Sequence, residues 1–428
     1  MLIVLWYIFL GSCVYLFQKE TKCFSQWNTF TFFLIFLLLF HGIYVPFILN
    51  YYDFLSDSVL INFIAGLVFM YIFLLVGVWI INLIYKFNPS HIEEKVIILR
   101  KGFNPLFFWS VFLLVLGLLV YRFISAEKLL TLFDFIWRTK TAEEYRQTRI
   151  LFSESITGER GGLFYFTNIL SSVATPFFIY LFYFIKSKTK KPVYGVLFWG
   201  LLSLFLYQGL ISGHKGTALF LLTGLFVCYS IKNKKSISFN IFNKKLVIFG
   251  TFLFLVVMPY LYMVQYPELN YDRAIYSTWS RMTIEPNRVL QLYYHIYPEK
   301  HPYLFGASSG WVAKSLGYEE LPPCAYIPRE FGAEGNWNVV FIGDAWADFG
   351  FAGIILSSLV VGMLLQWYNI WFIKSKKTAL VLATYVALIV ASYRLVSVGL
   401  GAGFLTFGVL SSFILYVTLS EMRWLKRR

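Results

Sequence analysis

The chain has 428 residues, of which 58% are hydrophobic, 21% aromatic and only 14% charged. A water-soluble domain of this length needs more charge to cover its surface, so the composition excludes an ordinary soluble protein and predicts a membrane protein. The net charge of +15 does not indicate nucleic-acid binding, because the lysines gather in short clusters between apolar runs.

Apolar runs recur along the whole chain, and a bilayer core needs roughly 20 apolar residues per crossing helix. The first run starts at Met1 without a basic n-region or cleavage site, so we interpret it as a span and not as a signal peptide. We predict an all-α polytopic bundle with about eleven spans. They are expected near 1–17, 27–49, 58–85, 104–124, 163–185, 193–211, 216–231, 246–264, 350–373, 378–394 and 400–420.

Every second connection between these spans is basic, and so is the C-terminal tail. The positive-inside rule therefore predicts a cytoplasmic C-terminus and, with an odd number of spans, an outside N-terminus. This organisation divides the chain into five parts. They are spans one to four (1–124), outer loop one (125–162), spans five to eight (163–264), a large outer loop (265–349), and spans nine to eleven with the basic tail (350–428).

The two predicted outer loops are longer than ordinary connections, which suggests that they carry function. The first has six basic and six acidic residues, and the second has six basic and ten acidic residues. Aromatics and glycines are mixed in both, and prolines occur in the second, so we expect folded and partly helical structure. No acidic residue falls inside a predicted span, which weighs against an ion-coupled transporter.

Cations stand at the outer ends of three predicted spans, where the positive-inside rule disfavours them. They are Arg122, the pair His214 and Lys215, and Arg394. Snorkelling to lipid headgroups would explain any one of them. Together they indicate an anionic group held at headgroup height, such as a lipid-linked pyrophosphate, since Arg and Lys bind phosphate oxygens.

The outer loops add further arginines at helical spacing. Arg146 and Arg149 are three residues apart in the first loop. In the second loop the arginines are spaced by eight and seven residues, which lines them along one helical side, although a proline must interrupt or kink that helix. A solvated amphipathic face is the simpler explanation. These residues are Arg273, Arg281, Arg288 and Pro286.

Two carboxylates precede the ninth predicted span. Asp344 and Asp348 are four residues apart and would share one face of a helix. Such a pair suits general acid/base chemistry, binding of a divalent metal, or simply the solubilisation of a helix start. Phosphate loops, dinucleotide fingerprints, zinc sets and nucleophile elbows are absent from the sequence, so we predict no metal and no cofactor.

Three stretches resemble the Wzy O-antigen (oligosaccharide repeat-unit) polymerases, and they occur in that family's order. The first is Gly213-His214-Lys215-Gly216 and the second is Arg281-Met282-Thr283-Ile284-Glu285-Pro286. The third runs from Asn338 through Asp348-Phe349-Gly350-Phe351-Ala352-Gly353 into a span. The layout of many spans, two sizeable outer loops and short basic inner connections is also similar.

The resemblance implies a fold like that of GT-C membrane glycosyltransferases, in the bacterial inner membrane. It implies transfer of a growing glycan from undecaprenyl pyrophosphate to a hydroxyl of the next undecaprenyl-pyrophosphate-linked repeat unit, without a nucleotide sugar. A chain-length regulator is an expected partner. We expect Arg281 to clamp the pyrophosphate, with the other named cations as weaker candidates. His214 and Asp348 are the first candidates for the base and Asp344 the next.

Other functions fit the same sequence. An O-antigen ligase would share topology and donor and differ in its acceptor. A flippase for lipid-linked glycans would favour charges deep within the spans. A membrane acyltransferase fits less well, because its catalytic histidine is expected near an early span, and the only early candidate there, His41, has neighbours that indicate packing at a helix end.

Overall fold

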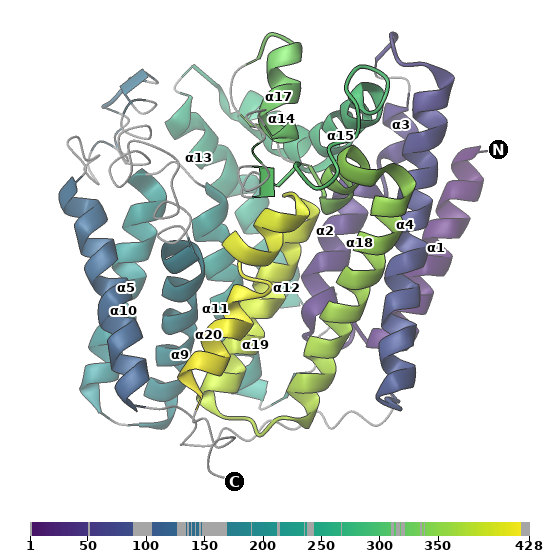
Figure 1. Cartoon of the computed structure of the whole chain (residues 1–428). Helices are drawn as coiled ribbons and strands as arrows, with labels where there is room; N and C mark the ends of the chain where they lie inside the picture. Colours follow the sequence, from purple (N-terminus) through teal and green to yellow (C-terminus); the bar gives the residue numbers. More distant parts are fainter. Residues whose placement is uncertain are drawn as a thin grey trace. The chain divides into compact units, whose positions relative to one another are not determined.

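The computed structural model describes most of residues 2–420 (Figure 1). The regular elements in this part of the chain are helices, which confirms the predicted all-α class. The residues outside the description are 1, 50–51, 89–104, 126–133, 135–136, 138, 142, 145–146, 148–168, 190, 212–214, 235, 238–243, 267, 310–311, 314–316, 318–321, 334–335, 338 and 421–428.

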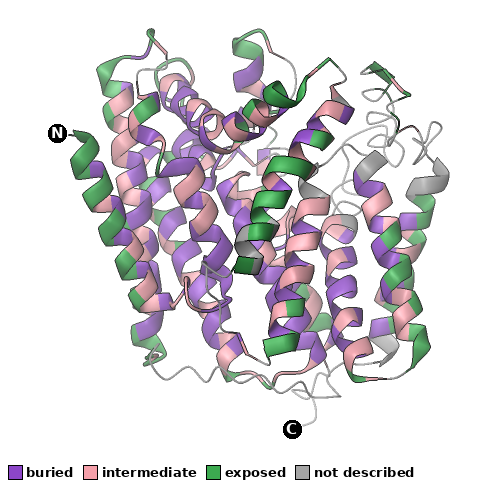
Figure 2. Cartoon of the chain, turned by 180° about the vertical axis from the view of Figure 1, so that it is seen from behind, coloured by how far each residue is buried: buried purple, intermediate pink, exposed green. Residues whose placement is uncertain are grey.

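Seven helical stretches among the described residues are long and apolar enough to cross a membrane. They run over Leu2–Thr21, Thr29–Ile48, Asp57–Ile84, Pro192–Gly209, Phe341–Lys374, Ala379–Val396 and Ala402–Leu419. Many of their apolar side chains are exposed, as along α1 (Leu2–Thr21; Figure 2). Lipid is the medium that would cover such surfaces, so the chain is a membrane protein of the all-α kind.

The four remaining predicted spans also fall on helices, but these are shorter or less apolar. The range 104–124 matches α5 (Pro105–Ser125), and 163–185 overlaps η2 (Leu170–Ala174) with α9 (Thr175–Lys188). The range 216–231 lies within α11 (Lys215–Lys234). The range 246–264 is divided among α12 (Lys244–Phe252), η3 (Leu253–Val257) and α13 (Met258–Gln265). The number of spans therefore stays a prediction.

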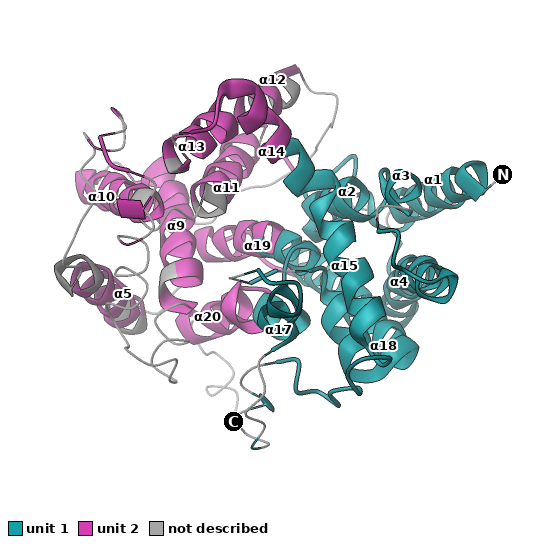
Figure 3. Ribbon diagram, turned by 90° about the horizontal axis from the view of Figure 1, so that it is seen from above, with its two compact units in different colours: residues 1–93, 279–374, 391–404 teal, residues 94–278, 375–390, 405–428 magenta. Residues whose placement is uncertain are grey.

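The described chain forms two compact units, each assembled from segments that are far apart in sequence (Figure 3). Unit 1 comprises residues 1–93, 279–374 and 391–404, and unit 2 comprises 94–278, 375–390 and 405–428. Unit 1 contains α1, α2 (Thr29–His41), α3 (Val45–Ile48), α4 (Asp57–Ile84), α15 (Glu285–Ile296), α17 (Pro323–Glu330), α18 (Phe341–Lys374) and η4 (Tyr393–Val396).

The longest helices of unit 1, α4 and α18, pack closely along each other. A Cβ at Gly77 would overlap the backbone at Leu359, and one at Gly362 would overlap the backbone at Leu74. Small residues allow such close approach between membrane helices. A buried hydrogen bond also joins the two helices, since Gln366 Nε2 donates to Asn82 Oδ1 at 2.6 Å.

Helix α15 lies across the ends of α2, α4 and α18 (Figures 1 and 3). Its apolar face is buried, and two buried polar side chains attach it to helix ends. Asn287 Oδ1 is 3.0 Å from His41 Nδ1, and Asn287 Nδ2 donates to the carbonyls of Phe40 and Thr283. Gln291 Nε2 donates to the Ile48 carbonyl at 3.1 Å. These bonds hold α15 as a rigid cover on unit 1.

Unit 2 contains α5, η2–α9, α10 (Pro192–Ile211), α11, the α12–η3–α13 run, most of α14 (Tyr271–Thr283) and α19 (Ala379–Ser392), and α20 (Ser411–Leu419). Its α5 and α9 join through a cluster of aromatic rings. Phe108 and Phe112 meet Phe178 and Phe182 at centroid distances between 5.3 and 5.8 Å. Aromatic edge-to-face contacts of this kind stabilise beyond simple burial.

Candidate functional site

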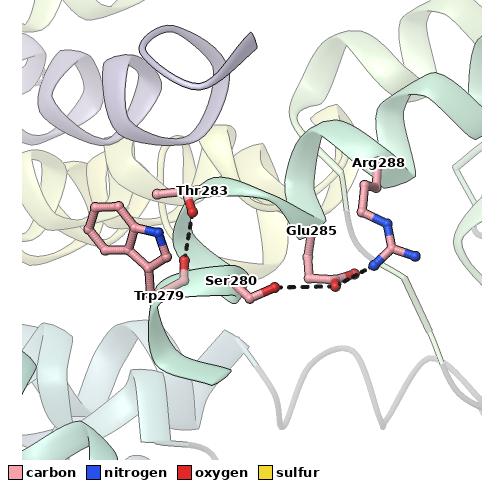
Figure 4. A network of polar contacts seen from close by, with 5 residues as sticks. All are labelled: Trp279, Ser280, Thr283, Glu285 and Arg288. Carbon is pink, nitrogen blue, oxygen red and sulfur yellow. Dashed lines mark hydrogen bonds and ion pairs between the residues drawn. The ribbon is translucent and has the colours of Figure 1, made fainter. Parts of the chain in front are cut away.

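The predicted interruption at Pro286 is confirmed, because α14 ends at Thr283 and α15 begins at Glu285. Proline lacks the N–H that would continue the first helix, but it suits the first turn of the second. Ile284 alone separates the two helices, and the Thr283 hydroxyl bonds back to the Trp279 carbonyl at 2.8 Å (Figure 4). The arginines of this region therefore lie on two helices instead of one continuous face.

Arg288 and Glu285 form an ion pair within the first turn of α15. Arg288 Nη1 is 2.7 Å from Glu285 Oε1, and the Ser280 hydroxyl lies 3.4 Å from the same oxygen (Figure 4). The guanidinium also lies over the Tyr52 ring, 5.3 Å from its centroid. Its charge is thus partly compensated within the protein. Arg281, on the last turn of α14, is exposed.

The two carboxylates of the third motif lie on a helix, as predicted, but that helix starts earlier than the expected span. Helix α18 begins at Phe341 and contains one non-helical residue, Gly350, with φ 59° and ψ −140°. The hydroxyl of Tyr303 lies 2.7 Å from where a Cβ of Gly350 would be. The part after Gly350, residues 351–374, is about 36 Å long, which is long enough to cross a bilayer core of about 30 Å. Asp344 and Asp348 precede it.

Asp348 is buried, and it anchors a loop. Its Oδ1 accepts from the Ser308 backbone N–H at 3.0 Å, and its Oδ2 accepts from the Ser308 hydroxyl at 2.6 Å. The backbone carbonyls of Ala347 and Asp348 accept from the N–H groups of Leu304 and Phe305. Both oxygens of this carboxylate therefore accept hydrogen bonds from the loop. This indicates a structural role for Asp348.

Asp344 has different surroundings. It is partly exposed, and it accepts no hydrogen bond from the described residues. Its carboxylate rests against the backbone of Gly399, because a Cβ at Gly399 would overlap Asp344 Oδ2. The absence of a side chain at Gly399 thus makes room for the carboxylate.

Tyr293 of α15 lies close to the same carboxylate. Its ring is completely buried, and its hydroxyl has no hydrogen-bond partner among the described residues. Burial raises the pKa of Tyr293 well above its usual value, and the nearby charge of Asp344 adds to that rise. Tyr293 therefore stays protonated.

A second tyrosine of α15, Tyr294, packs against Trp346 of α18. Tyr294 is buried and stacks on Trp346 at a centroid distance of 4.2 Å, and its hydroxyl occupies the space left by Gly66. The Trp346 N–H donates to the Tyr297 carbonyl at 2.9 Å. Burial lowers the pKa of His295, and the charge of Lys300 lowers it further. His295 is therefore a neutral neighbour at the end of the same helix.

The other predicted site residues are distributed over the chain. Arg394 lies in η4 of unit 1, whereas Arg273 belongs to unit 2. Arg122 lies on α5 and Lys215 begins α11, but their side chains are outside the description. The remaining three predicted residues, His214, Arg146 and Arg149, lie outside the described residues.

Three features near the carboxylates have no counterpart in the sequence reasoning. Gly399 makes room for Asp344, the charge of Asp344 raises the pKa of Tyr293, and Ser308 holds Asp348. The run Gly399-Leu400-Gly401-Ala402-Gly403 was a usable signal for the first, since glycine often marks close backbone approach. His41 is fully buried and hydrogen-bonded to Asn287, so it is a packing residue.

Among these residues, Asp344 is the one whose surroundings suit proton transfer. The partly exposed carboxylate of Asp344 can accept a proton from a substrate hydroxyl. Among the described residues, no group of three or more His, Cys, Asp or Glu side chains could hold a metal ion. Comparisons of the chain with protein-family models, with curated proteins and with solved structures found no match. Function must therefore be inferred from these residues and their geometry.

Proposed function

We propose that the chain is a membrane glycosyltransferase that polymerises oligosaccharide repeat units carried on undecaprenyl pyrophosphate. The observation that carries the proposal is the start of α18, where Asp344 stands free of hydrogen bonds from the described residues just before a helix crosses the membrane. This is the stretch whose motif resembles the Wzy polymerases. The basic connections support an orientation with this end of α18 outside the cytoplasm.

In the proposed reaction, a hydroxyl oxygen of the incoming repeat unit attacks the anomeric carbon of the growing glycan. The new C–O bond forms as the bond from the anomeric carbon to the pyrophosphate oxygen breaks. The hydroxyl proton goes to a carboxylate, and undecaprenyl pyrophosphate leaves with the electron pair. A base that removes the proton contributes about 10²- to 10⁴-fold to such a rate.

We assign the base to Asp344 in preference to Asp348. Both oxygens of Asp348 are bonded to Ser308, whereas the Asp344 carboxylate is partly exposed. A group that accepts a proton from substrate must be reachable by it, and this favours Asp344. His214 stays a second candidate for the base. A His214→Ala variant with normal polymer would remove it and leave the carboxylate.

The leaving pyrophosphate needs cations, and Arg281 is the leading one. It is exposed at the end of α14 and belongs to the second stretch that resembles the Wzy polymerases. Cations that stabilise charge developing on a leaving oxygen are typically worth about 10²- to 10³-fold. Arg281→Ala should abolish long polymer at normal protein levels. Arg281→Lys is the matched control, because it keeps the charge, loses the bidentate fork and should retain part of the activity.

Deletion of the gene, followed by gel analysis of the surface glycan, tests the proposed function. A polymerase predicts a single capped repeat in place of a ladder, restored by the wild-type chain. Loss of all capping would contradict the polymerase and indicate the ligase. Accumulation of lipid-linked units on the cytoplasmic side would contradict it and indicate the flippase.

A further inference from the structure

A tight turn lies beside the start of α18 and presents an aromatic ring. The N–H of Ala307 bonds to the carbonyl of Leu304 at 3.0 Å, and both residues between them have positive φ, 49° at Phe305 and 100° at Gly306. Turns with positive φ at both central positions favour Asn, Asp or Gly there. A phenylalanine at the first of these positions is unusual, because its Cβ crowds the following carbonyl.

The turn is held rigidly in this unfavourable conformation. Leu304, Ala307 and Ser308 are buried, and Asp348 binds Ser308 through both carboxylate oxygens. The Phe305 N–H also bonds to the Asp348 carbonyl at 3.2 Å. Strained residues that their surroundings maintain occur preferentially at functional sites.

The ring of Phe305 packs little against the protein, because 65% of the residue is exposed. It meets Phe349, which is 49% exposed, at a centroid distance of 6.0 Å and an interplanar angle of 71°. The turn thus adopts an unfavourable backbone conformation, and its result is an apolar ring that points outward. Neither packing nor turn preference explains that choice of residue.

We infer that Phe305 and Phe349 form an aromatic platform, in which Phe349 supports the Phe305 ring edge to face and the open face of Phe305 binds a sugar ring of the glycan. The C–H groups on one face of a pyranose carry slight positive charge, and they lie favourably on the negative face of an aromatic ring. The platform adjoins the helix that carries Asp344, so it would orient the sugar whose hydroxyl reacts. This inference rests on the proposed function, because it takes its ligand from that reaction.

A sugar fits these observations better than the lipid headgroup layer does. Aromatic belts at membrane surfaces use Trp and Tyr, whose polar atoms reach the headgroups, and phenylalanine has no such atom. A ring that faces lipid also needs no strained backbone, since any exposed helix position supplies one. Here a turn with a buried carboxylate anchor holds the ring.

Phe305→Asn separates binding from folding. Asparagine tolerates positive φ, so this variant should fold at least as well as the wild type while losing the platform. Phe349→Ala removes the second ring. Phe54→Asn is the matched control, because Phe54 is 51% exposed in the same unit and lies outside the platform. The full chain is assayed in nanodiscs with glycan released by mild acid from the surface polysaccharide of the producing cells.

Saturation-transfer NMR should give a dissociation constant at least tenfold higher for Phe305→Asn and for Phe349→Ala than for the wild type and Phe54→Asn. Unchanged affinity in both platform variants would overturn the inference. A Phe305→Trp variant adds a second readout. Quenching of its fluorescence by brominated phospholipids in vesicles would overturn the inference in favour of the membrane, whereas a change on adding the released glycan would support it.

The two proposals fail in different ways. If deletion of the gene leaves the polymer ladder intact but glycan binding still depends on Phe305, the polymerase is wrong and the platform stands. If deletion collapses the ladder but Phe305→Asn binds glycan like the wild type, the platform is wrong and the polymerase stands.

Discussion

Asp344 and Asp348 lie one turn apart on the same helix, yet their surroundings give them different tasks. Asp348 is enclosed by the loop at 304–308 and bonded twice to Ser308. Asp344 rests on the bare backbone of Gly399 and keeps part of its surface exposed. A buried carboxylate with satisfied hydrogen bonds stabilises structure, whereas an accessible one can exchange protons.

The difference shows that two identical side chains at helical spacing are not two equivalent candidates. Each role depends on the element packed over that turn of α18, which is a loop for Asp348 and the Gly399 backbone for Asp344. Neither element is near α18 in sequence. The division of tasks between the two carboxylates can be broken or sharpened by the following changes.

The largest effect is expected from Asp344→Asn. Loss of the base should reduce polymer formation by about 10²- to 10⁴-fold, with little change in the apparent melting temperature. Polymer length on gels and the melting temperature in detergent measure the two effects. Asp272→Asn, at an exposed carboxylate on α14, is the control and should leave both unchanged. Full-length polymer in Asp344→Asn would exclude Asp344 as the base.

Gly399→Ala should be next in size. The added methyl group would occupy the space of Asp344 Oδ2, so the carboxylate must move. A displacement of about 1 Å at a reacting group costs on the order of 10²-fold in rate. Gly11→Ala is the control, because nothing lies within 4 Å of a Cβ there. Equal polymer yields from both alanine variants would show that Gly399 does not position Asp344.

Ser308→Ala should act on stability more than on activity. It removes the hydroxyl bond to Asp348 Oδ2 and leaves that buried oxygen without its donor. We expect unfolding to become easier by about 1–3 kcal/mol, measured by denaturant unfolding in detergent. Ser309→Ala is the neighbouring control and should be nearly neutral. A destabilisation of the same size in both variants would contradict the anchoring role of Asp348.

Glu285→Gln should have the smallest effect. The Arg288–Glu285 pair is partly exposed, with 43% of the glutamate side chain accessible, so its loss should cost less than about 1 kcal/mol. The variant also removes the carboxylate that compensates Arg288. An unfolding free energy lowered by several kcal/mol would show that this ion pair is structural.

Several parts of the architecture follow from the sequence alone. The apolar runs predict helices because the bilayer imposes their length, and seven of these stretches have the length and hydropathy of spans. The end of α14 before Glu285 follows from Pro286, which cannot donate a backbone hydrogen bond. The shared helix of Asp344 and Asp348 follows from their spacing.

The start of α18 could not be predicted from the local sequence. The segment before Gly350 carries Asp344 and Asp348, and the span was expected to begin after them, at 350. The helix begins at Phe341, and Gly350 takes a positive φ inside it, with the Tyr303 hydroxyl in the space that a Cβ would need. Tertiary packing decides this feature, and no local pattern contains it.

The different roles of Asp344 and Asp348 could not be predicted from the sequence either. They depend on Ser308 and Gly399, which reach α18 only through the fold of the whole unit. Spacing identified the pair, and the reaction implied by the resemblance was assigned Asp348 before Asp344, whereas the contacts favour Asp344. The predictions for His214, Arg146 and Arg149 remain open, since these residues lie outside the described part of the chain.

The most direct test compares Asp344→Ala with Asp348→Ala in the same strain and the same detergent. We expect the two variants to differ in opposite ways in melting temperature and in polymer formation. Asp344→Ala should keep the wild-type melting temperature and lose the polymer ladder. Asp348→Ala should melt at a clearly lower temperature and still make some polymer at permissive temperature. An Asp344→Ala variant that makes a normal ladder, beside a stable Asp348→Ala variant that makes none, would contradict it.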